Sequence, residues 1–171
     1  KYIMLDITKK EKLKKLKGNF DIIVNAGGYG GLDENFKNKN KMYKDQYDGL
    51  KNISSHFLNK RITKFVQIGS SLEYGQLSKI NRENDKTIYP LTIYGRAKLR
   101  STDYLLFLYK VFNFPVTILR LYQVYGPHQK TNRFIPYIIK SAIKRDNIYT
   151  SAGNQIRDFC YIDDVVDAIL K

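Results

Sequence analysis

Residues 65–70 read Phe-Val-Gln-Ile-Gly-Ser, a short and largely apolar run that ends in a glycine and a serine. Its length, together with its β-branched and aromatic residues, predicts a buried strand. Further along the chain, residues 92–112 have a helical pattern, and residues 116–121 predict the next strand. A strand, a helix and a second strand in this order indicate a parallel sheet covered by helices.

The same alternation of strands and helices extends along the rest of the chain. The fold class is therefore α/β, a doubly wound parallel sheet, whose ligands bind beyond the carboxyl ends of the strands. Further strands are predicted at Tyr2 to Asp6 and at Asp21 to Asn25. Helices are predicted near 9–17, where the sequence is Lys-rich, and near 42–59 and 134–145. A last helix runs to residue 171, and Asp163 or Asp164 would cap it.

Composition excludes several classes of site. At 171 residues, with 43% hydrophobic residues, the chain has the length and apolar content of one globular domain. Cys160 is the only cysteine, and His56 and His128 are the only histidines, so no disulfide framework and no His/Cys zinc site can form. We therefore expect no metal, and any catalysis must use other groups.

The net charge of +14 comes mostly from lysines spread along the chain. No recognised nucleic-acid-binding motif accompanies it, so we expect no nucleic-acid partner, although a diffuse positive field favours anionic ligands such as nucleotide diphosphates. No apolar run approaches 18 residues and no leader pattern is present at the start, so we expect neither membrane spanning nor secretion. The cytoplasm is the expected compartment.

Tyr94 and Lys98 stand four residues apart in the helix predicted at 92–112, so their side chains share one helix face. A neighbouring cation favours a phenolate, which suits a proton shuttle to a sugar hydroxyl. Tyr47 and Lys51 repeat this spacing, so the spacing alone identifies nothing.

Ser70 distinguishes the two tyrosine–lysine pairs. It ends the strand predicted at 65–70 and precedes Tyr94 in the chain, whereas no such serine precedes Tyr47. A serine, a tyrosine and a lysine in this order form a candidate acid/base site. The alternative interpretation is that Ser70 and Ser71 are ordinary turn-forming residues, and the spacing does not separate the two.

Several stretches of the chain resemble the extended short-chain dehydrogenase/reductase superfamily, in its NAD-dependent epimerase/dehydratase branch, and they occur in the order found in that family. The resemblance covers nearly the whole chain. The matching stretches are Leu5-Asp-Ile7, Val24-Asn-Ala-Gly27, Ile68-Gly-Ser-Ser-Leu-Glu-Tyr-Gly75, Tyr94-Gly-Arg-Ala-Lys98, Leu119-Arg-Leu-Tyr-Gln-Val-Tyr-Gly-Pro127, and Gly153-Asn-Gln-Ile-Arg-Asp-Phe159 with Tyr161-Ile-Asp-Asp164.

This resemblance implies roles for the residues at the predicted strand ends. Tyr94 would be the acid/base on the sugar hydroxyl, Ser70 would bond that oxygen, and Lys98 would support Tyr94 while binding the nicotinamide ribose. The cofactor would be NAD or NADP. It would also contact Asp6 and Ile7 at the adenine, Asn25, Ala26 and Gly27 along its length, and Tyr122 near the nicotinamide. A plain glycine-rich loop is the alternative interpretation for residues 25–31.

The resemblance also implies a nucleotide-diphosphate sugar as substrate. Gln123 would face the sugar, with Ser70 and Ser71, and Arg157 would clamp the diphosphate with its planar fork of donors. Asn132 and Arg133 are further candidates for the phosphate end. Ordinary solvated arginines are the alternative for Arg133 and Arg157.

Some family features are missing from the chain. The Gly-rich phosphate loop and the first βαβ unit are absent, so the Rossmann-like domain is incomplete, and we expect a piece of a longer enzyme. Gln46 stands where the family usually has asparagine. We assign residues 1–125 to a partial cofactor-binding domain and 126–171 to a partial substrate-binding region that returns to the first part.

We expect an NAD(P)-dependent nucleotide-sugar epimerase or 4-keto reductase. The sugar 4,6-dehydratases that the chain resembles need a carboxylic acid soon after the serine, but Ser71 and Leu72 follow Ser70. Glu73 comes one place too late in an extended segment, unless a bulge follows Ser70. The alternatives are such a dehydratase, or a catalytically inert nucleotide-binding or interaction protein on the same fold. Because residues 104–109 are apolar around most of their helix, we expect another subunit or domain to cover a second face of it. The resemblance implies a homodimer of the intact protein through the helices at 42–59 and 92–112.

Overall fold

The computed structural model describes residues 2–28, 36–75, 80–85 and 89–171. These residues form two compact units, Lys1–Leu121 and Tyr122–Lys171. The boundary between the units falls four residues before the end of the predicted cofactor-binding part. Which unit serves which ligand remains a prediction.

The first unit contains a parallel sheet of three strands in the order β1-β2-β3. These are β1 (Ile22–Asn25), β2 (Lys64–Ser70) and β3 (Val116–Leu121), with Val24 opposite Val66 and Gln67 opposite Ile118. All three match predicted strands. The parallel α/β class is therefore confirmed, and the carboxyl ends of the strands lie at one edge of the sheet.

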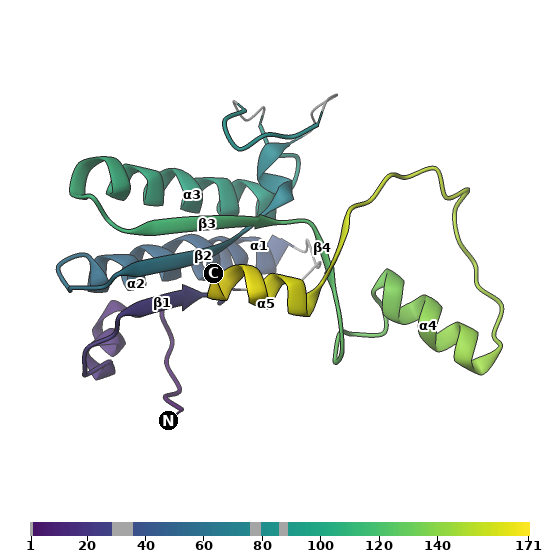
Figure 1. The fold of residues 1–171 in the computed structure, drawn as a ribbon, viewed down its shortest axis with the longest axis horizontal. Coiled ribbons are helices and arrows are strands. Elements are labelled where there is room, and N and C mark those ends of the chain that lie inside the picture. Colours follow the sequence, from purple (N-terminus) through teal and green to yellow (C-terminus); the bar gives the residue numbers. More distant parts are fainter. Residues whose placement is uncertain (1, 29–35, 76–79, 86–88) are drawn as a thin grey trace. The chain divides into compact units, whose positions relative to one another are not determined.

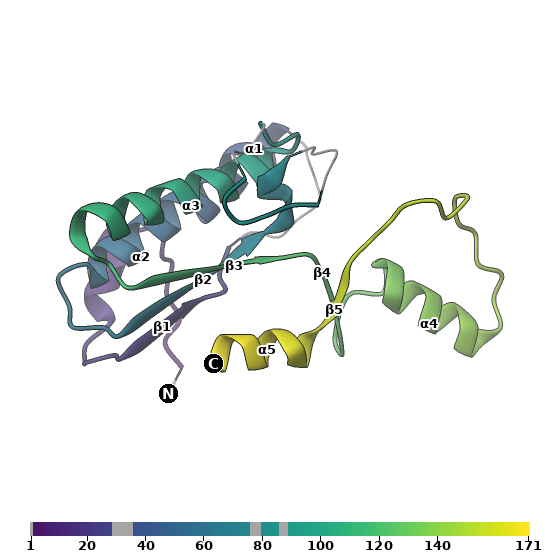
Figure 2. The same ribbon diagram turned by 45° about the horizontal axis from the view of Figure 1, so that its top comes forward.

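Helices α2 (Gly49–Phe57) and α3 (Ile93–Phe112) lie on the same face of this sheet (Figures 1 and 2). Thr92 caps α3, as its hydroxyl oxygen accepts the N–H of Gly95 at 3.0 Å, and the left-handed Asn113 ends it. The helix predicted from Thr92 is thus confirmed. The buried side chains between helices and sheet are Leu50, Phe57, Phe65, Leu105, Leu108 and Phe114.

The helix predicted near 42–59 begins earlier and is not uniform. It comprises α1 (Phe36–Tyr43), the π-helical turn η2 (Lys44–Asp48) and α2, joined end to end. Ser101 of α3 donates its hydroxyl to the carbonyl of Gln46 at 3.2 Å, so a neighbouring helix satisfies a carbonyl within the widened turn. The predicted Lys-rich helix is a 3-10 helix, η1 (Lys10–Lys15).

The strand predicted at Tyr2 to Asp6 is wrong. This segment has no strand assignment, and the side chains of Tyr2 and Met4 are fully exposed. None of the described strands pairs with it, so its backbone groups gain no ladder of hydrogen bonds. An apolar run becomes a strand only where a partner strand lies beside it.

The second unit contains two short parallel strands, β4 (Gln123–Tyr125) and β5 (Phe159–Tyr161), followed by α5 (Ile162–Leu170). Neither strand was predicted, because three residues carry no readable periodicity. The helix expected near 134–145 is present as α4 (Phe134–Lys144). The predicted cap of the last helix is wrong: Tyr161 is the cap residue, and Asp163 and Asp164 lie in the first turn, where their charges favour the helix N-terminus.

No helix within the part of the chain that the structure describes has both the length and the apolar character needed to span a bilayer.

Candidate active site

Ser70 ends the central strand β2 and is buried, with 8% of its surface exposed. The chain then forms the 3-10 turn η3 (Ser71–Tyr74), and Ser70 Oγ accepts the N–H of Leu72 at 3.2 Å. The hydroxyl therefore caps a turn, as the alternative interpretation expected. Because Oγ accepts in this bond, its own O–H can still donate to a ligand. Ser71, the first residue of the turn, is half-buried.

Gly95 allows the start of α3 to approach this turn. A Cβ atom on Gly95 would lie 2.7 Å from the carbonyl oxygen of Leu72, closer than real Cβ contacts come. Only glycine permits this backbone-to-backbone approach. The approach brings the first turn of α3, which carries Tyr94, against the turn that begins at Ser70.

Lys98 reaches from α3 to the strand that delivers Ser70. Its side chain is buried, with 4% of its surface exposed, and Nζ donates to the carbonyl oxygen of Ile68 at 2.8 Å. The same Nζ lies 5.7 Å from the centre of the Tyr94 ring. The three predicted catalytic residues thus come from β2 and α3, and the Lys98–Ile68 bond ties those elements together.

Burial lowers the pKa of Lys98 to about 8, and the negative charge of Glu73 opposes this fall. An ammonium with this pKa is largely protonated at neutral pH. It therefore places a positive charge beside Tyr94 there, and loses that charge in mildly alkaline solution.

The rival pair, Tyr47 and Lys51, has different surroundings. Tyr47 packs against the rings of Tyr43 and Tyr104, with ring centres 5.6 and 6.1 Å apart, and Lys51 is exposed. Neither residue lies at the carboxyl end of a strand. The Tyr47–Lys51 spacing is therefore part of helix packing.

The predicted cofactor loop follows β1. Asn25, buried at the end of that strand, donates to Gln67 Oε1 at 2.8 Å and accepts the N–H of Gly27 at 3.3 Å. Its side chain thus fixes the turn, while the backbone of Ala26 and Gly27 is exposed. A small, exposed backbone segment at a strand's carboxyl end can lie close to a ligand.

The segment with Asp6 and Ile7 lies beside this loop. Ile7 Cδ1 is 3.9 Å from where a Cβ on Gly27 would be, and Asn52 of α2 donates to the carbonyls of Ile7 and Thr8 at 3.1 and 2.9 Å. Asp6 is exposed, and hydrogen bonds from Thr8 lower the pKa of its carboxyl. The apolar Ile7 side chain therefore lies beside the exposed loop, and the ionised Asp6 precedes it in the chain.

Two residues outside the predicted site connect these elements. Gln67, buried in β2, accepts from Asn25 and donates to Ile68 O at 2.9 Å, so the carbonyl that binds Lys98 has a second donor. Asn52 holds the segment with Asp6 and Ile7. A glutamine inside the apolar run at 65–70 was the available signal for Gln67, whereas Asn52 left no signal in the sequence.

The predicted substrate residues of the second unit share no described pocket. Arg157 is exposed and donates to the carbonyl of Ile156 at 3.2 Å, and Arg133 is half-buried before α4. Their roles stay predictions. The others, Tyr122, Gln123 and Asn132, are exposed.

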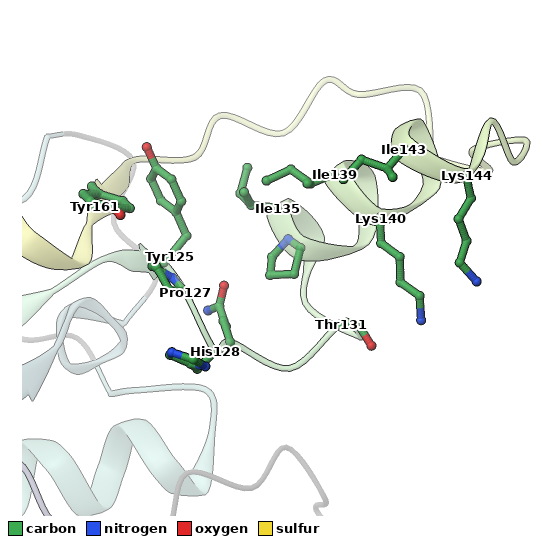
Figure 3. A pocket seen from close by; sticks show the side chains of 13 residues that line it. Tyr125, Pro127, His128, Thr131, Ile135, Ile139, Lys140, Ile143, Lys144 and Tyr161 are labelled. Carbon is green, nitrogen blue, oxygen red and sulfur yellow. The ribbon is translucent and has the colours of Figure 1, made fainter.

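A cavity of about 520 Å³ lies within the second unit, between α4 and the segment after β4. Ile135, Ile139 and Ile143 form a row along α4 at this cavity, while Lys140 and Lys144 extend from the helix in another direction (Figure 3). The cavity is lined by none of the predicted site residues.

Comparison with known proteins assigns the family. The model of the NAD dependent epimerase/dehydratase family matches residues 1–171. The chain belongs to this family. The resemblance predicted from the Ser70, Tyr94 and Lys98 stretches is confirmed.

Individual members of the NAD dependent epimerase/dehydratase family match most of the chain. An ADP-L-glycero-D-manno-heptose-6-epimerase from Brachyspira hyodysenteriae is 35% identical over 73% of the chain and 42% of its own length. A dTDP-D-glucose 4,6-dehydratase from Dictyostelium discoideum is 27% identical over 97% of the chain and 39% of its own length.

A solved structure supports the fold assignment. It is a mutant of UDP-glucuronic acid 4-epimerase from Bacillus cereus, in complex with UDP-4-deoxy-4-fluoro-glucuronic acid and NAD. It superimposes with a TM-score of 0.86 at 26% identity, over 98% of this chain and 54% of that one. The chain thus spans about half the length of these relatives, or less.

Proposed function

We propose that this chain is part of an NAD(P)-dependent nucleotide-sugar epimerase or 4-keto reductase. Its relatives extend well beyond the matched part, so the activity is assigned to an intact protein that contains this chain. Within the chain, the proposal rests on Ser70, Tyr94 and Lys98.

One observation carries the proposal: the buried Lys98 ammonium on α3 donates to Ile68 O, two residues before Ser70 in β2. This bond links the strand that ends at Ser70 to the helix that carries Tyr94 and Lys98, which supports a shared site. An inert protein on the same fold would have no need to keep a buried cation at this place, because burying a charge is costly.

The described residues fit a dinucleotide. Ala26 and Gly27 expose backbone at the carboxyl end of β1, beside the apolar Ile7, which follows the ionised Asp6 in the chain. These residues would hold the adenine end and the middle of NAD or NADP, with Lys98 toward the ribose. The bound cofactor would accept a hydride from the sugar and return one.

The chain's own residues would transfer the proton of the reacting sugar hydroxyl. Ser70 donates to the reacting sugar oxygen and fixes its position, and Tyr94 takes or returns that oxygen's proton. The Lys98 ammonium stabilises negative charge on Tyr94 as the proton moves. Tyr122, Gln123, Asn132, Arg133 and Arg157 stay proposed ligand contacts in the intact protein.

Glu73 favours this reaction class over a 4,6-dehydratase. Its side chain is fully buried, and both carboxylate oxygens accept protein hydrogen bonds, from Ser70 N, Thr102 Oγ1 and Arg120 Nε. This burial and bonding support the proposal, because the acid that expels a hydroxyl group as water must contact the sugar.

The test is product analysis with the intact protein. It is incubated with NAD⁺, and in a second series with NADPH, and with UDP-, dTDP- and ADP-hexoses, and the products are followed by NMR. Inversion at C4, or reduction of a 4-keto sugar, is expected. A 4-keto-6-deoxy product formed at an ordinary enzymatic rate would refute the reaction class, and binding without turnover would favour the inert alternative.

We also propose a homodimer of the intact protein through α3. Leu105 and Leu108 face the core, while Leu106, Phe107 and Tyr109 are 41%, 51% and 55% exposed on the same helix. Such an apolar surface fits an interface. Sedimentation of the intact protein at micromolar concentration tests this, and a monomer would contradict it.

A further inference from the structure

Glu73 is a buried charge without an assigned role in the reaction. It lies in η3, three residues after Ser70, and none of its surface is exposed. A buried carboxylate lowers stability unless charged or polar partners compensate for its lost hydration. Its partners therefore indicate what it does.

Three donors surround the Glu73 carboxylate, and each comes from a different part of the site. Oε1 accepts the backbone N–H of Ser70 at 2.7 Å. Oε2 accepts the hydroxyl of Thr102 on α3 at 2.7 Å and Nε of Arg120 on β3 at 3.0 Å. One carboxylate thus joins the end of β2, α3 and β3.

The backbone around Glu73 is shaped to admit the carboxylate. A Cβ atom on Gly69 would lie 2.7 Å from Glu73 Oε1, so the glycine before Ser70 leaves the space that the carboxylate fills. Ser70 in turn accepts from Leu72 N, which makes a reciprocal cap of the turn. The position of Ser70 therefore depends on Glu73 through both its backbone N–H and the turn that follows.

Glu73 also acts on Lys98 through its charge. Thr102, its partner on α3, lies one helical turn beyond Lys98, and Glu73 is the charge that opposes the burial-driven fall of the Lys98 pKa. The other groups beside these two side chains are Tyr94 on α3 and Arg120 on β3, whose guanidinium lies 4.7 Å from the Tyr74 ring centre.

We propose that Glu73 is a positioning residue for the reaction: its carboxylate holds the Ser70 turn against the helix that carries Tyr94 and Lys98. The effect of Glu73 on turnover rests on the proposed function. The effect of Glu73 on Lys98 does not depend on that function.

The first measurement therefore needs no substrate. The intact protein is labelled with ¹³C at the lysine ε-carbons, and Lys98 is titrated by NMR, its signal assigned by its loss in Lys98→Met. In Glu73→Gln we expect the Lys98 pKa to fall below the wild-type value, because the opposing negative charge is gone. Asp45→Asn, which removes a carboxylate paired with Lys41, is the control and should leave Lys98 unchanged.

The second measurement is the pH profile of turnover. In Glu73→Gln we expect the alkaline limb of kcat to move to lower pH with the Lys98 pKa. We also expect kcat to fall roughly 10- to 100-fold, less than the roughly 10²- to 10⁴-fold that acid/base catalysis supplies, with the Kd for NAD unchanged. If the wild-type protein turns over no sugar nucleotide, the proposed function fails, while the Lys98 titration still decides whether Glu73 acts on Lys98.

Glu73→Gln leaves Arg120 without its anion and is expected to be unstable. The double variant Glu73→Gln/Arg120→Gln removes both charges and keeps hydrogen-bonding groups at both positions, so it serves as the folded comparison. Because the like charge of Arg120 is removed as well, its Lys98 pKa should lie between those of Glu73→Gln and the wild type. If the folded double variant titrates and turns over as the wild type does, Glu73 is only a stability element and the inference is overturned.

Discussion

Replacing Lys98 by methionine should stabilise the fold while removing activity. The fall of the Lys98 pKa from 10.5 to about 8 means that the buried ammonium costs about 3 kcal/mol at neutral pH. Methionine has a similar length and no charge. The carbonyl of Ile68 keeps a donor from Gln67 at 2.9 Å and is not left unpaired. We expect Lys98→Met to raise the free energy of unfolding at pH 7 by roughly 1–3 kcal/mol.

The increase in the free energy of unfolding of Lys98→Met should become smaller as pH rises. Because the folded pKa of Lys98 lies below its unfolded value, the unfolded chain holds more protons between pH 8 and 10.5. This group's contribution therefore makes the wild-type protein more stable as pH rises through that window, and the advantage of the variant shrinks. The cost is fully present below pH 8.

Urea unfolding at pH 7 and at pH 10 measures both effects. Lys51→Met is the matched control, because Lys51 is exposed and should show neither the gain nor its pH dependence. A Lys98→Met protein that is less stable than the wild type at pH 7 would refute the reasoning. So would a gain that is equal at both pH values.

Three further outcomes are expected. Tyr94→Phe should lower turnover by roughly 10²- to 10⁴-fold with NAD affinity nearly unchanged, whereas Tyr47→Phe should retain activity. If the two variants turn over equally fast, Tyr94 is not the proton shuttle. Gly95→Ala should cost roughly 1–3 kcal/mol in unfolding free energy, measured by urea, since the added Cβ would collide with a backbone carbonyl. Asn52→Leu should weaken NAD binding, measured by calorimetry, more than it lowers kcat, because Asn52 holds the carbonyls of Ile7 and Thr8. An unchanged Kd for NAD would contradict this.

Local patterns in the sequence were sufficient for most of the first unit. The apolar run at 65–70, the helix after Thr92 and the strand at 116–121 each carry their own periodicity, cap or turn signal. A strand-end Ser70 followed by a helical Tyr94 and Lys98 is also a linear pattern. The family and the candidate catalytic residues therefore followed from the sequence.

Partners distant in the sequence were decided only by the tertiary structure. Residues 2–6 have strand-like composition, but none of the strands in the described part of the chain pairs with them. The three-residue β4 and β5 form because each has the other to pair with. Glu73 shows the same principle in the site. The sequence identifies a carboxylate near Ser70. Only the packing of α3 and β3 around it, through Thr102 and Arg120, makes it a buried, fully bonded group instead of an acid exposed to a sugar. The Glu73–Thr102 bond joins residues that are 29 positions apart in the sequence, and the Glu73–Arg120 bond joins residues that are 47 positions apart. Contacts over such separations leave no periodic pattern in the local sequence.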